Sequence, residues 1–258
     1  MIKNFIFDVD GTLLDSNDYH AQAWVEAFAA YGKRIPFKKV RRCMGKGADQ
    51  LLPEFLNKKE MKEMGKDLGQ LSGEIFKRKY LAKVRPFPKV RALFKKIRQS
   101  GARIALASSA DAEELKKYEK IARIQDLVEK STSADDANKS KPSPDIFHAA
   151  LKLLRNPKHD AVLVVGDSPV DALAAKRAKI ASVGVLCGGF SKKILAGNGC
   201  RAVYKDPADL LKNVGTLLKQ PQFRQTYFRA APNQPRLEFS LILPGPDRKP
   251  GSWLQETN

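Results

Sequence analysis

The chain has 258 residues, of which 43% are hydrophobic and 29% are charged, so it holds enough apolar material for a folded core. Its longest apolar runs are too short to cross a bilayer, and its three cysteines lack the spacing of a disulfide framework or a zinc site. The N-terminus reads as a short strand that leads into acidic residues, not as a signal peptide, so we expect a soluble, cytoplasmic protein.

The formal net charge is +19, and about half of it lies in residues 33–85, where 16 Lys and Arg face 6 Asp and Glu. A basic field of this kind concentrates anions near the surface. It would suit a phosphorylated metabolite or the backbone of a nucleic acid, and it would also serve as an ordinary solvated surface. The charge by itself leaves these alternatives open.

Apolar runs predict five strands along the chain. They cover residues 3–8, 103–108, 161–166, 182–186 and 202–204. Between them, apolar residues recur at helical spacing over 90–97 and over 146–153. Continuous apolar strands that alternate with helices predict a doubly wound, Rossmann-like α/β fold, with a parallel sheet covered on both faces.

One segment interrupts this alternation. Residues 17–84 contain no convincing strand, and their apolar residues recur at helical spacing near 23–31 and 61–75. We expect a core domain formed by residues 1–16 and 85–219, with residues 17–84 inserted after the first strand as an all-helical cap domain. Residues 220–258 are rich in Pro, Gln and Asn, so we expect a loose extension, apart from an apolar run at 237–243 that could form a strand or dock on the core.

Polar residues follow three of the predicted strands at their carboxyl ends. They are Asp8, Asp10 and Thr12 after the first strand, Ser108 and Ser109 after the second, and Asp167 and Asp171 after the third. Ligands of open α/β sheets bind outside the carboxyl ends of the strands, so we expect these clusters to meet in one crevice. Lys139 and Lys141 lie in the loop before the helix over 146–153 and could join them.

This set of residues suits phosphoryl transfer. Asp8 and Asp10 stand two residues apart, and the chain can turn at Gly11 so that both carboxylates reach one centre. Asp167 and Asp171 add hard oxygen ligands of the kind that Mg²⁺ prefers. A metal ion and a lysine would neutralise the phosphate, so that an anionic aspartate can attack it.

Four motifs in this order resemble those of the haloacid dehalogenase-like hydrolases. They are Asp8-Val9-Asp10-Gly11-Thr12, the strand end at Ser108, Lys141-Pro142, and Gly166-Asp167-Ser168-Pro169-Val170-Asp171, within residues 2–209. The start of the helical segment, with Asp15-Ser16-Asn17, His20 and Trp24, resembles the cap of the branch that contains phosphoglycolate phosphatase and β-phosphoglucomutase. The run from Gly184 to Leu186, with Gly188-Gly189-Phe190, is similar to the phosphoglycolate phosphatase-like members.

The resemblance implies a role for each matching residue. It makes Asp8 the nucleophile and a magnesium ligand, and it makes Asp10 the general acid and base, with its backbone carbonyl on the metal. Asp167 and Asp171 complete the metal site, while Ser108 and Lys141 bind the phosphoryl group. An acid at position 10 favours phosphate esters over carbon–halogen or carbon–phosphorus bonds. We therefore expect a Mg²⁺-dependent phosphomonoesterase that hydrolyses a small phosphorylated metabolite through an aspartyl phosphate on Asp8.

Other residues are candidates for contact with the phosphate or the rest of the substrate. They are Thr12, Ser109, His20 and Lys46, the last in a loop of the cap. Some site residues also have a purely structural interpretation: Ser108 or Ser109 as a helix N-cap, Asp171 as an acid at a helix start, and His20 as a partly buried cap residue. Lys139 competes with Lys141 for the place beside the nucleophile.

Two other functions remain open at this point. One is a phosphosugar mutase of the β-phosphoglucomutase type, which is disfavoured because this chain has Ala48, with Lys46 nearby, where such proteins carry an arginine. The other is nucleic-acid binding by the basic cap, for which the sequence offers no recognition motif. The sequence predicts no membrane partner and does not indicate the oligomeric state.

Overall fold

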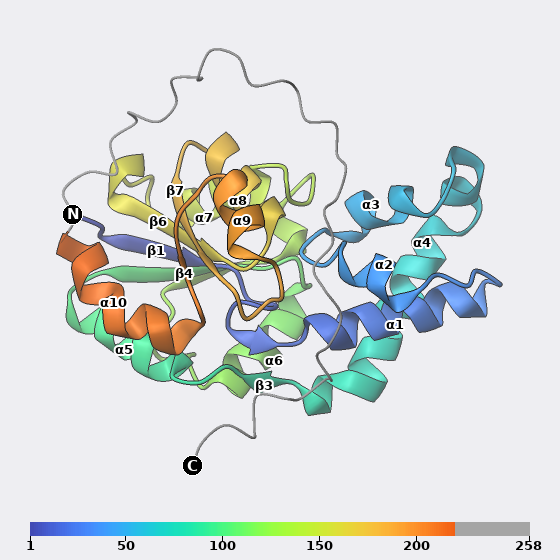
Figure 1. Cartoon of the computed structure of the whole chain (residues 1–258), viewed down its shortest axis with the longest axis horizontal. Coiled ribbons are helices and arrows are strands. Elements are labelled where there is room, and N and C mark those ends of the chain that lie inside the picture. The colour runs from blue at the N-terminus through green and yellow to red at the C-terminus, as the bar shows by residue number, and fades with distance from the viewer. Residues whose placement is uncertain (220–258) are drawn as a thin grey trace.

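The computed structural model describes residues 1–219, in which a parallel sheet of six strands runs through the molecule (Figure 1). In spatial order the strands are β5 (Lys130–Thr132), β4 (Arg103–Ala107), β1 (Asn4–Phe7), β6 (Val162–Gly166), β7 (Ala181–Val185) and β8 (Cys200–Tyr204). All neighbouring pairs are parallel. The strand order reverses beside β1, and such reversal points are where doubly wound sheets bind ligands.

The predicted fold class and the five predicted strands are confirmed, each strand to within two residues. The sixth strand, β5, was not predicted. It has only three residues, and its sequence, Lys-Ser-Thr, contains none of the apolar residues on which the strand predictions rested. The predictions for residues 220–258 lie outside the described residues.

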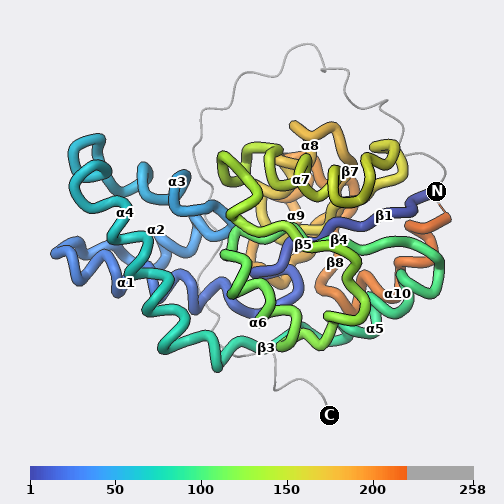
Figure 2. The backbone as a smooth tube through the Cα atoms, turned by 180° about the vertical axis from the view of Figure 1, so that it is seen from behind, coloured from blue at the N-terminus to red at the C-terminus, as the bar shows by residue number. Residues whose placement is uncertain are grey.

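Helices cover both faces of the sheet (Figures 1 and 2). The side chains of Phe5 and Phe7 belong to one core cluster, with residues of α5 (Val90–Gln99), α6 (Ala112–Ala122) and α10 (Pro207–Lys219). Ile6, between them, belongs to a second cluster, with residues of α7 (Asp145–Leu153) and α8 (Pro169–Arg177). Successive strand residues point to opposite faces, so one four-residue strand contributes to both cores.

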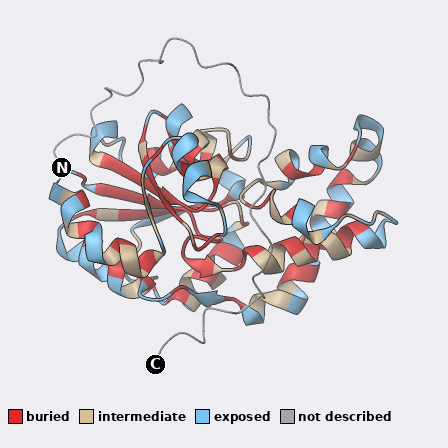
Figure 3. Cartoon of the chain, viewed as in Figure 1, coloured by how far each residue is buried: buried red, intermediate tan, exposed pale blue. Residues whose placement is uncertain are grey.

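Burial follows the same pattern, with buried residues along the central strands and on the helix faces that meet them (Figure 3). The short helix α9 (Lys192–Gly197) packs against β7 and β8. Between these elements lie the short 3-10 helices η4 (Ala134–Asp136) and η5 (His159–Ala161). Among residues 1–219, no helix combines the length and the apolar character that crossing a bilayer requires.

Residues 17–84 form a group of helices beside the sheet, here called the helical insert (Figure 1). Its elements are α1 (Asn17–Ala30), α2 (Phe37–Arg41), α3 (Ala48–Leu51), η1 (Leu52–Glu54), α4 (Lys58–Ile75), the π-helix η2 (Phe76–Tyr80) and η3 (Leu81–Lys83). The two helices expected near 23–31 and 61–75 are present as α1 and α4. None of these described residues forms a strand, as expected; the division into separate domains stays a prediction.

A two-stranded ribbon joins the insert to the core. The chain leaves through β2 (Leu14–Asp15) and returns through β3 (Arg85–Pro86), which pair antiparallel. The N–H of Phe87 also donates to the carbonyl of Leu13 at 2.9 Å. The outgoing strand β2 begins four residues after Asp10, and its pairing brings β3 beside it, so both crossings anchor the insert near the proposed site.

The aromatic contact between β1 and α5 should contribute to the stability of the core. Phe94 is fully buried, and its ring centroid lies 4.8 Å from that of Phe7. We expect Phe94→Ala to lower the free energy of unfolding by about 3–5 kcal/mol, because it leaves a cavity in a close-packed region. The matched control is Lys95→Ala at the exposed neighbouring position, which should change it by less than about 0.5 kcal/mol. Urea denaturation measures the free energy of unfolding of both variants. Equal losses would contradict the burial of Phe94 against Phe7.

Candidate active site

The predicted polar clusters meet at the carboxyl ends of neighbouring strands. Asp8 follows β1, Ser108 follows β4 and Asp167 follows β6. The N–H of Asp8 donates to the carbonyl of Val165 at 2.9 Å, and that of Ser108 donates to the carbonyl of Thr132 at 3.0 Å. The hydrogen bonding of the sheet thus continues one residue beyond the strands and fixes the backbone positions of Asp8 and Ser108.

Lys141 lies among the carboxylates of this site. Its Nζ donates to Asp8 Oδ1 at 2.6 Å and to the carbonyl of Ala107 at 3.1 Å, and it forms an ion pair with Asp171 Oδ1 at 2.9 Å. The Lys141 side chain is 1% exposed. Lys139, the competing candidate, is exposed at the surface. The structure therefore places Lys141, and not Lys139, beside Asp8.

Asp171 has one oxygen in the site and one in a helix cap. Its Oδ2 accepts hydrogen bonds from the N–H of Ser168 at 3.1 Å and from its hydroxyl at 2.5 Å, in a capping box at the start of α8. Its Oδ1 faces Lys141. The structural and the site interpretations of Asp171 are thus compatible, because each uses a different oxygen.

Asp8, Asp167 and Asp171 form a buried cluster that could hold a metal ion. One carboxylate oxygen of each lies within 4.8 Å of the others. Thr12 Oγ1 lies 2.8 Å from Asp8 Oδ2 and 3.2 Å from Asp167 Oδ1, and Asn17 Nδ2 donates to Asp167 Oδ2 at 2.9 Å. Hard, anionic oxygens are the donors that Mg²⁺ prefers.

The electrostatics of the cluster also fit a bound cation. Burial raises the pKa of Asp8, the charge of Asp171 adds to this, and Lys141 offsets only part of it, so that the pKa reaches about 7. Burial and the charges of Asp8 and Asp171 likewise raise the pKa of Asp167 well above its usual range. For Lys141, burial acts to lower the pKa, but the two carboxylates outweigh it and raise the pKa. One ammonium group does not balance three buried carboxylates, whereas an added divalent cation would.

Two glycines leave room for Asp167. A Cβ atom at Gly188 would lie 1.7 Å from Asp167 Oδ2, closer than any non-bonded contact allows. Gly11 has φ of +75°, and a Cβ there would lie 2.0 Å from Asn17 Nδ2 and 2.4 Å from Asp167 Oδ2. Glycine is required at both positions for the carboxylate to sit where it does.

Asp10 lies beside this cluster with separate hydrogen-bond partners. Its Oδ1 accepts from Ser16 Oγ at 2.5 Å and lies 3.1 Å from His20 Nε2. The same nitrogen lies 2.8 Å from the hydroxyl of Tyr118, and the ring of His20 stacks on Phe76 with centroids 3.7 Å apart. His20 thus contacts the predicted general acid, and its predicted contact with substrate stays a prediction.

The pKa values of Asp10 and His20 shift in opposite directions. Burial acts to raise the pKa of Asp10, but His20, Ser16 and Tyr118 together outweigh it and lower that pKa. Burial acts to lower the pKa of His20, but Asp10 and Glu114 outweigh it and raise that pKa. Both shifts favour the charged forms of the pair.

The helical insert lies directly against the core at this site. Arg41 Nη2 donates to the carbonyl of Gly188 at 2.6 Å, and the N–H of Ser140 donates to Asp49 Oδ2 at 3.3 Å. A Cβ at Gly45 would lie 2.7 Å from the hydroxyl of Ser168. The segment from α2 to α3 therefore touches the loops that carry Lys141, Asp167 and Gly188.

The remaining predicted residues are less directly placed. Lys46 Nζ binds Glu54 Oε1 of the insert at 2.7 Å. Ser108 is buried, and its hydroxyl accepts from the N–H of Ala110 at 3.1 Å, while Ser109 is half-buried. Phosphate or substrate binding by Lys46, Ser108, Ser109 and Thr12 stays a prediction.

The sequence identified Ser16 and Asn17 only as part of the cap motif, and it indicated no site role for Glu114 or Tyr118. Asn17 donates to Asp167, and Glu114 and Tyr118 approach His20. The site role of Asn17 could have been found, because it directly follows the Asp-Ser pair at the start of the cap. Glu114 and Tyr118 stand four residues apart on α6, and only the fold shows that they face the site.

Comparisons with known proteins agree with this geometry. A family model described as haloacid dehalogenase-like hydrolase matches residues 5–185. The chain belongs to this family. This hydrolase is 31% identical over 198 residues to a phosphoglycolate phosphatase of Vibrio vulnificus, covering 72% of this chain and 85% of the relative. It is 27% identical over 207 residues to a phosphorylated carbohydrates phosphatase of Thermotoga maritima, covering 80% and 95%.

The fold of this hydrolase is also that of solved relatives. A crystal structure of a hydrolase from Pseudomonas syringae matches it with a TM-score of 0.76 at 29% identity, covering 83% of this chain and 99% of that one. The family resemblance carried by the four motifs is therefore confirmed. The prediction that the chain is an enzyme of this family, related to phosphatases, is confirmed as well.

Removal of the buried ammonium group of Lys141 should destabilise this hydrolase. In Lys141→Met the carboxylates of Asp8 and Asp171 lose their shared partner, and we expect the free energy of unfolding in EDTA to fall by about 3–5 kcal/mol. Adding Asp171→Asn to that variant should restore part of the loss, because one uncompensated charge is removed. The control is Lys139→Met at the exposed lysine, with a change below about 0.5 kcal/mol. Urea unfolding at pH 7 measures the stability of all three variants. Equal losses for Lys141→Met and Lys139→Met would be evidence against a buried Lys141 between Asp8 and Asp171.

Proposed function

We propose that this hydrolase is a Mg²⁺-dependent phosphomonoesterase that hydrolyses a small phosphorylated metabolite through an aspartyl phosphate on Asp8. The observation that supports this most strongly is the position of Asp8. Its Oδ1 is held by the buried ammonium group of Lys141 at 2.6 Å, and two further buried carboxylates lie beside it. This arrangement suits a nucleophile that must approach an anion. The ammonium group of Lys141 and a bound metal ion would neutralise the charge of the phosphoryl group.

In the first step, a carboxylate oxygen of Asp8 attacks phosphorus and the bond from phosphorus to the leaving oxygen breaks. Asp10 gives its proton to that oxygen, so that a neutral alcohol departs. In the second step, Asp10 takes a proton from water as the water oxygen attacks phosphorus, and the carboxylate of Asp8 leaves. The lowered pKa of Asp10 suits the base step, and the negative phosphoryl group arriving beside it favours the protonated form for the acid step.

The other residues hold charge and position. Asp8, Asp167 and Asp171, with the backbone carbonyl of Asp10, would hold the Mg²⁺ ion, which would supply positive charge to neutralise the phosphoryl group. Lys141 keeps Asp8 oriented and would offer its ammonium group to the phosphoryl oxygens, and Ser108 would donate a hydrogen bond to them. The relatives named phosphoglycolate phosphatase and phosphorylated carbohydrates phosphatase support a small phosphorylated substrate.

Binding of Mg²⁺ should stabilise the folded protein. An ion that binds only the native state contributes about 2.7 kcal/mol at a hundred times its Kd, which corresponds to a rise in Tm of roughly 5–10 °C for a chain of this size. In Asp167→Asn we expect this rise to disappear, while the Tm in EDTA stays equal or increases because carboxylate repulsion is relieved. Thermal unfolding with and without Mg²⁺ measures both. An undiminished Mg²⁺ effect in the variant would show that the ion binds elsewhere.

Catalysis should depend on the carboxylate of Asp8. We expect hydrolysis of p-nitrophenyl phosphate in Mg²⁺, its loss in EDTA, and a decrease of more than about a thousandfold in Asp8→Asn, which keeps the shape of the side chain but not its nucleophilic oxygen. Lys139→Met, at the exposed lysine, is the matched control and should retain activity. Full activity of Asp8→Asn would refute the mechanism.

A phosphate-release screen over phosphoglycolate and sugar phosphates would identify the substrate. Release of inorganic phosphate without any added bisphosphate is the result that this proposal predicts. An isomeric sugar phosphate that forms only when a bisphosphate is supplied would instead support the mutase alternative.

A further inference from the structure

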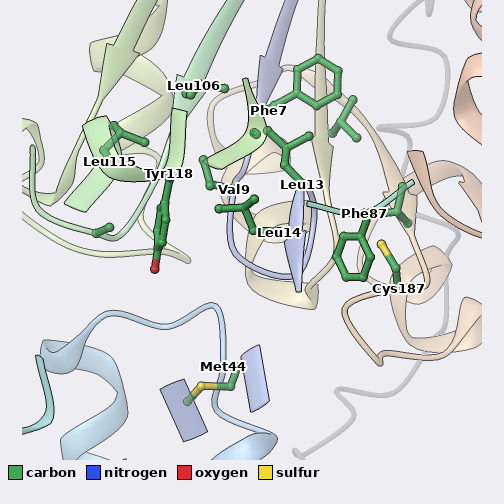
Figure 4. Close-up of a cluster of buried hydrophobic side chains, with 14 of the residues drawn as sticks. Phe7, Val9, Leu13, Leu14, Met44, Phe87, Leu106, Leu115, Tyr118 and Cys187 are labelled. Atoms are coloured by element: carbon green, nitrogen blue, oxygen red, sulfur yellow. The ribbon is translucent and has the colours of Figure 1, made fainter. Parts of the chain in front are cut away.

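Glu114 and Tyr118 form a buried pair on α6, at the boundary between the core and the helical insert. They stand one helical turn apart, and they are 5% and 1% exposed. The hydroxyl of Tyr118 donates to Glu114 Oε1 at 2.7 Å and lies 2.8 Å from His20 Nε2. Tyr118 extends from the core cluster with its hydroxyl directed toward the helices of the insert (Figure 4).

The ring of Tyr118 packs in the hydrophobic core, but packing does not account for the carboxylate of Glu114. Within residues 1–219, Glu114 forms no ion pair with Lys or Arg; its one charged contact is His20 Nε2 at 3.9 Å. Burial raises the pKa of Glu114, which reflects the free-energy cost of keeping a carboxylate away from water. An apolar residue at this position would avoid that cost, so the carboxylate needs another explanation.

The directions of the hydrogen bonds provide an explanation for the carboxylate of Glu114. A carboxylate oxygen only accepts, so the proton between Tyr118 and Glu114 belongs to the tyrosine. With its proton directed at Glu114, the Tyr118 oxygen presents a lone pair to His20 Nε2. That nitrogen must then carry a hydrogen, whether the ring is neutral or charged. The same Nε2–H lies 3.1 Å from Asp10 Oδ1, so His20 faces Asp10 as a donor.

We propose that Tyr118 and Glu114 are positioning residues for Asp10. Glu114 orients the hydroxyl of Tyr118, Tyr118 orients the protonated Nε2 of His20, and His20, with Ser16, holds Oδ1 of Asp10 so that the carboxyl group keeps one orientation toward the leaving oxygen. This inference rests on the proposed function, in which Asp10 exchanges the proton of the leaving group. Neither residue of the pair touches the phosphoryl site.

The role predicts a dependence on the leaving group. An alkoxide must receive a proton as it leaves, whereas p-nitrophenolate departs without one. We expect Tyr118→Phe to slow release of the alcohol from β-glycerol phosphate by about tenfold to hundredfold, a part of the 10²–10⁴ that acid–base catalysis contributes. The single-turnover burst of p-nitrophenol from p-nitrophenyl phosphate should change by less than about twofold, because that step uses Asp8 and not the proton of Asp10. KM for either substrate should stay unchanged.

The chain offers a matched control. Tyr80 donates a hydrogen bond to Glu26 within the insert, so Tyr80→Phe removes a Tyr–Glu hydrogen bond of the same kind away from Asp10. It should leave both reactions unchanged. Glu114→Gln provides a second test if Tyr118→Phe folds poorly, and it should show a smaller loss with the same selectivity. The double variant should be no slower than Tyr118→Phe, because the two residues act as one unit.

The outcomes separate this inference from the proposed function. Equal slowing of the two substrates by Tyr118→Phe, or no slowing of either, would overturn the positioning role while Asp8→Asn still abolished activity. Activity that survives Asp8→Asn would remove the proposed function itself. Slowing confined to the alkyl phosphate supports both.

Discussion

The site depends on one electrostatic constraint: within residues 1–219, three buried carboxylates lie together, and the one buried ammonium group among them pairs with only two. Asp8, Asp167 and Asp171 repel one another, and Lys141 balances only part of their charge. Like charges this close are stable only with an additional cation or with protonation. The proposed Mg²⁺ ion would offset this imbalance, and together with Lys141 it would offer positive charge to an incoming phosphate.

The fold supplies the geometry that this constraint requires. Parallel strands deliver Asp8 and Asp167 to the same edge of the sheet, where the strand order reverses, and the insert leaves and returns through a ribbon beside them. Glycine at 188 allows the loop after β7 to pass against Asp167, and its carbonyl accepts from Arg41 of the insert. Core and insert are thus both in contact with the charged cluster, and the parts that would select the substrate meet the parts that would carry out the chemistry.

Much of this arrangement could be predicted from the sequence. Long apolar runs identified the central strands, and their carboxyl ends identified Asp8 and Asp167. The family resemblance favoured Lys141, but the local pattern also allowed Lys139, since both lie in one polar loop and burial separates them only in the structure. The sequence did not reveal β5, which is short and polar, or the Glu114–Tyr118 pair, since polar residues one helical turn apart are common on exposed helix faces. Contacts across the boundary between insert and core depend on tertiary structure and carry no local signal.

The proposed mechanism requires that the carboxylate held by Lys141 becomes phosphorylated. Acyl phosphates are reduced by borohydride to the corresponding alcohol, so the protein can be mixed with substrate and Mg²⁺, quenched with sodium borohydride, digested and examined by mass spectrometry. The account predicts homoserine in place of Asp8, dependent on both substrate and Mg²⁺. An unmodified Asp8 under conditions of continuing turnover, or the modification of a different carboxylate, would contradict it.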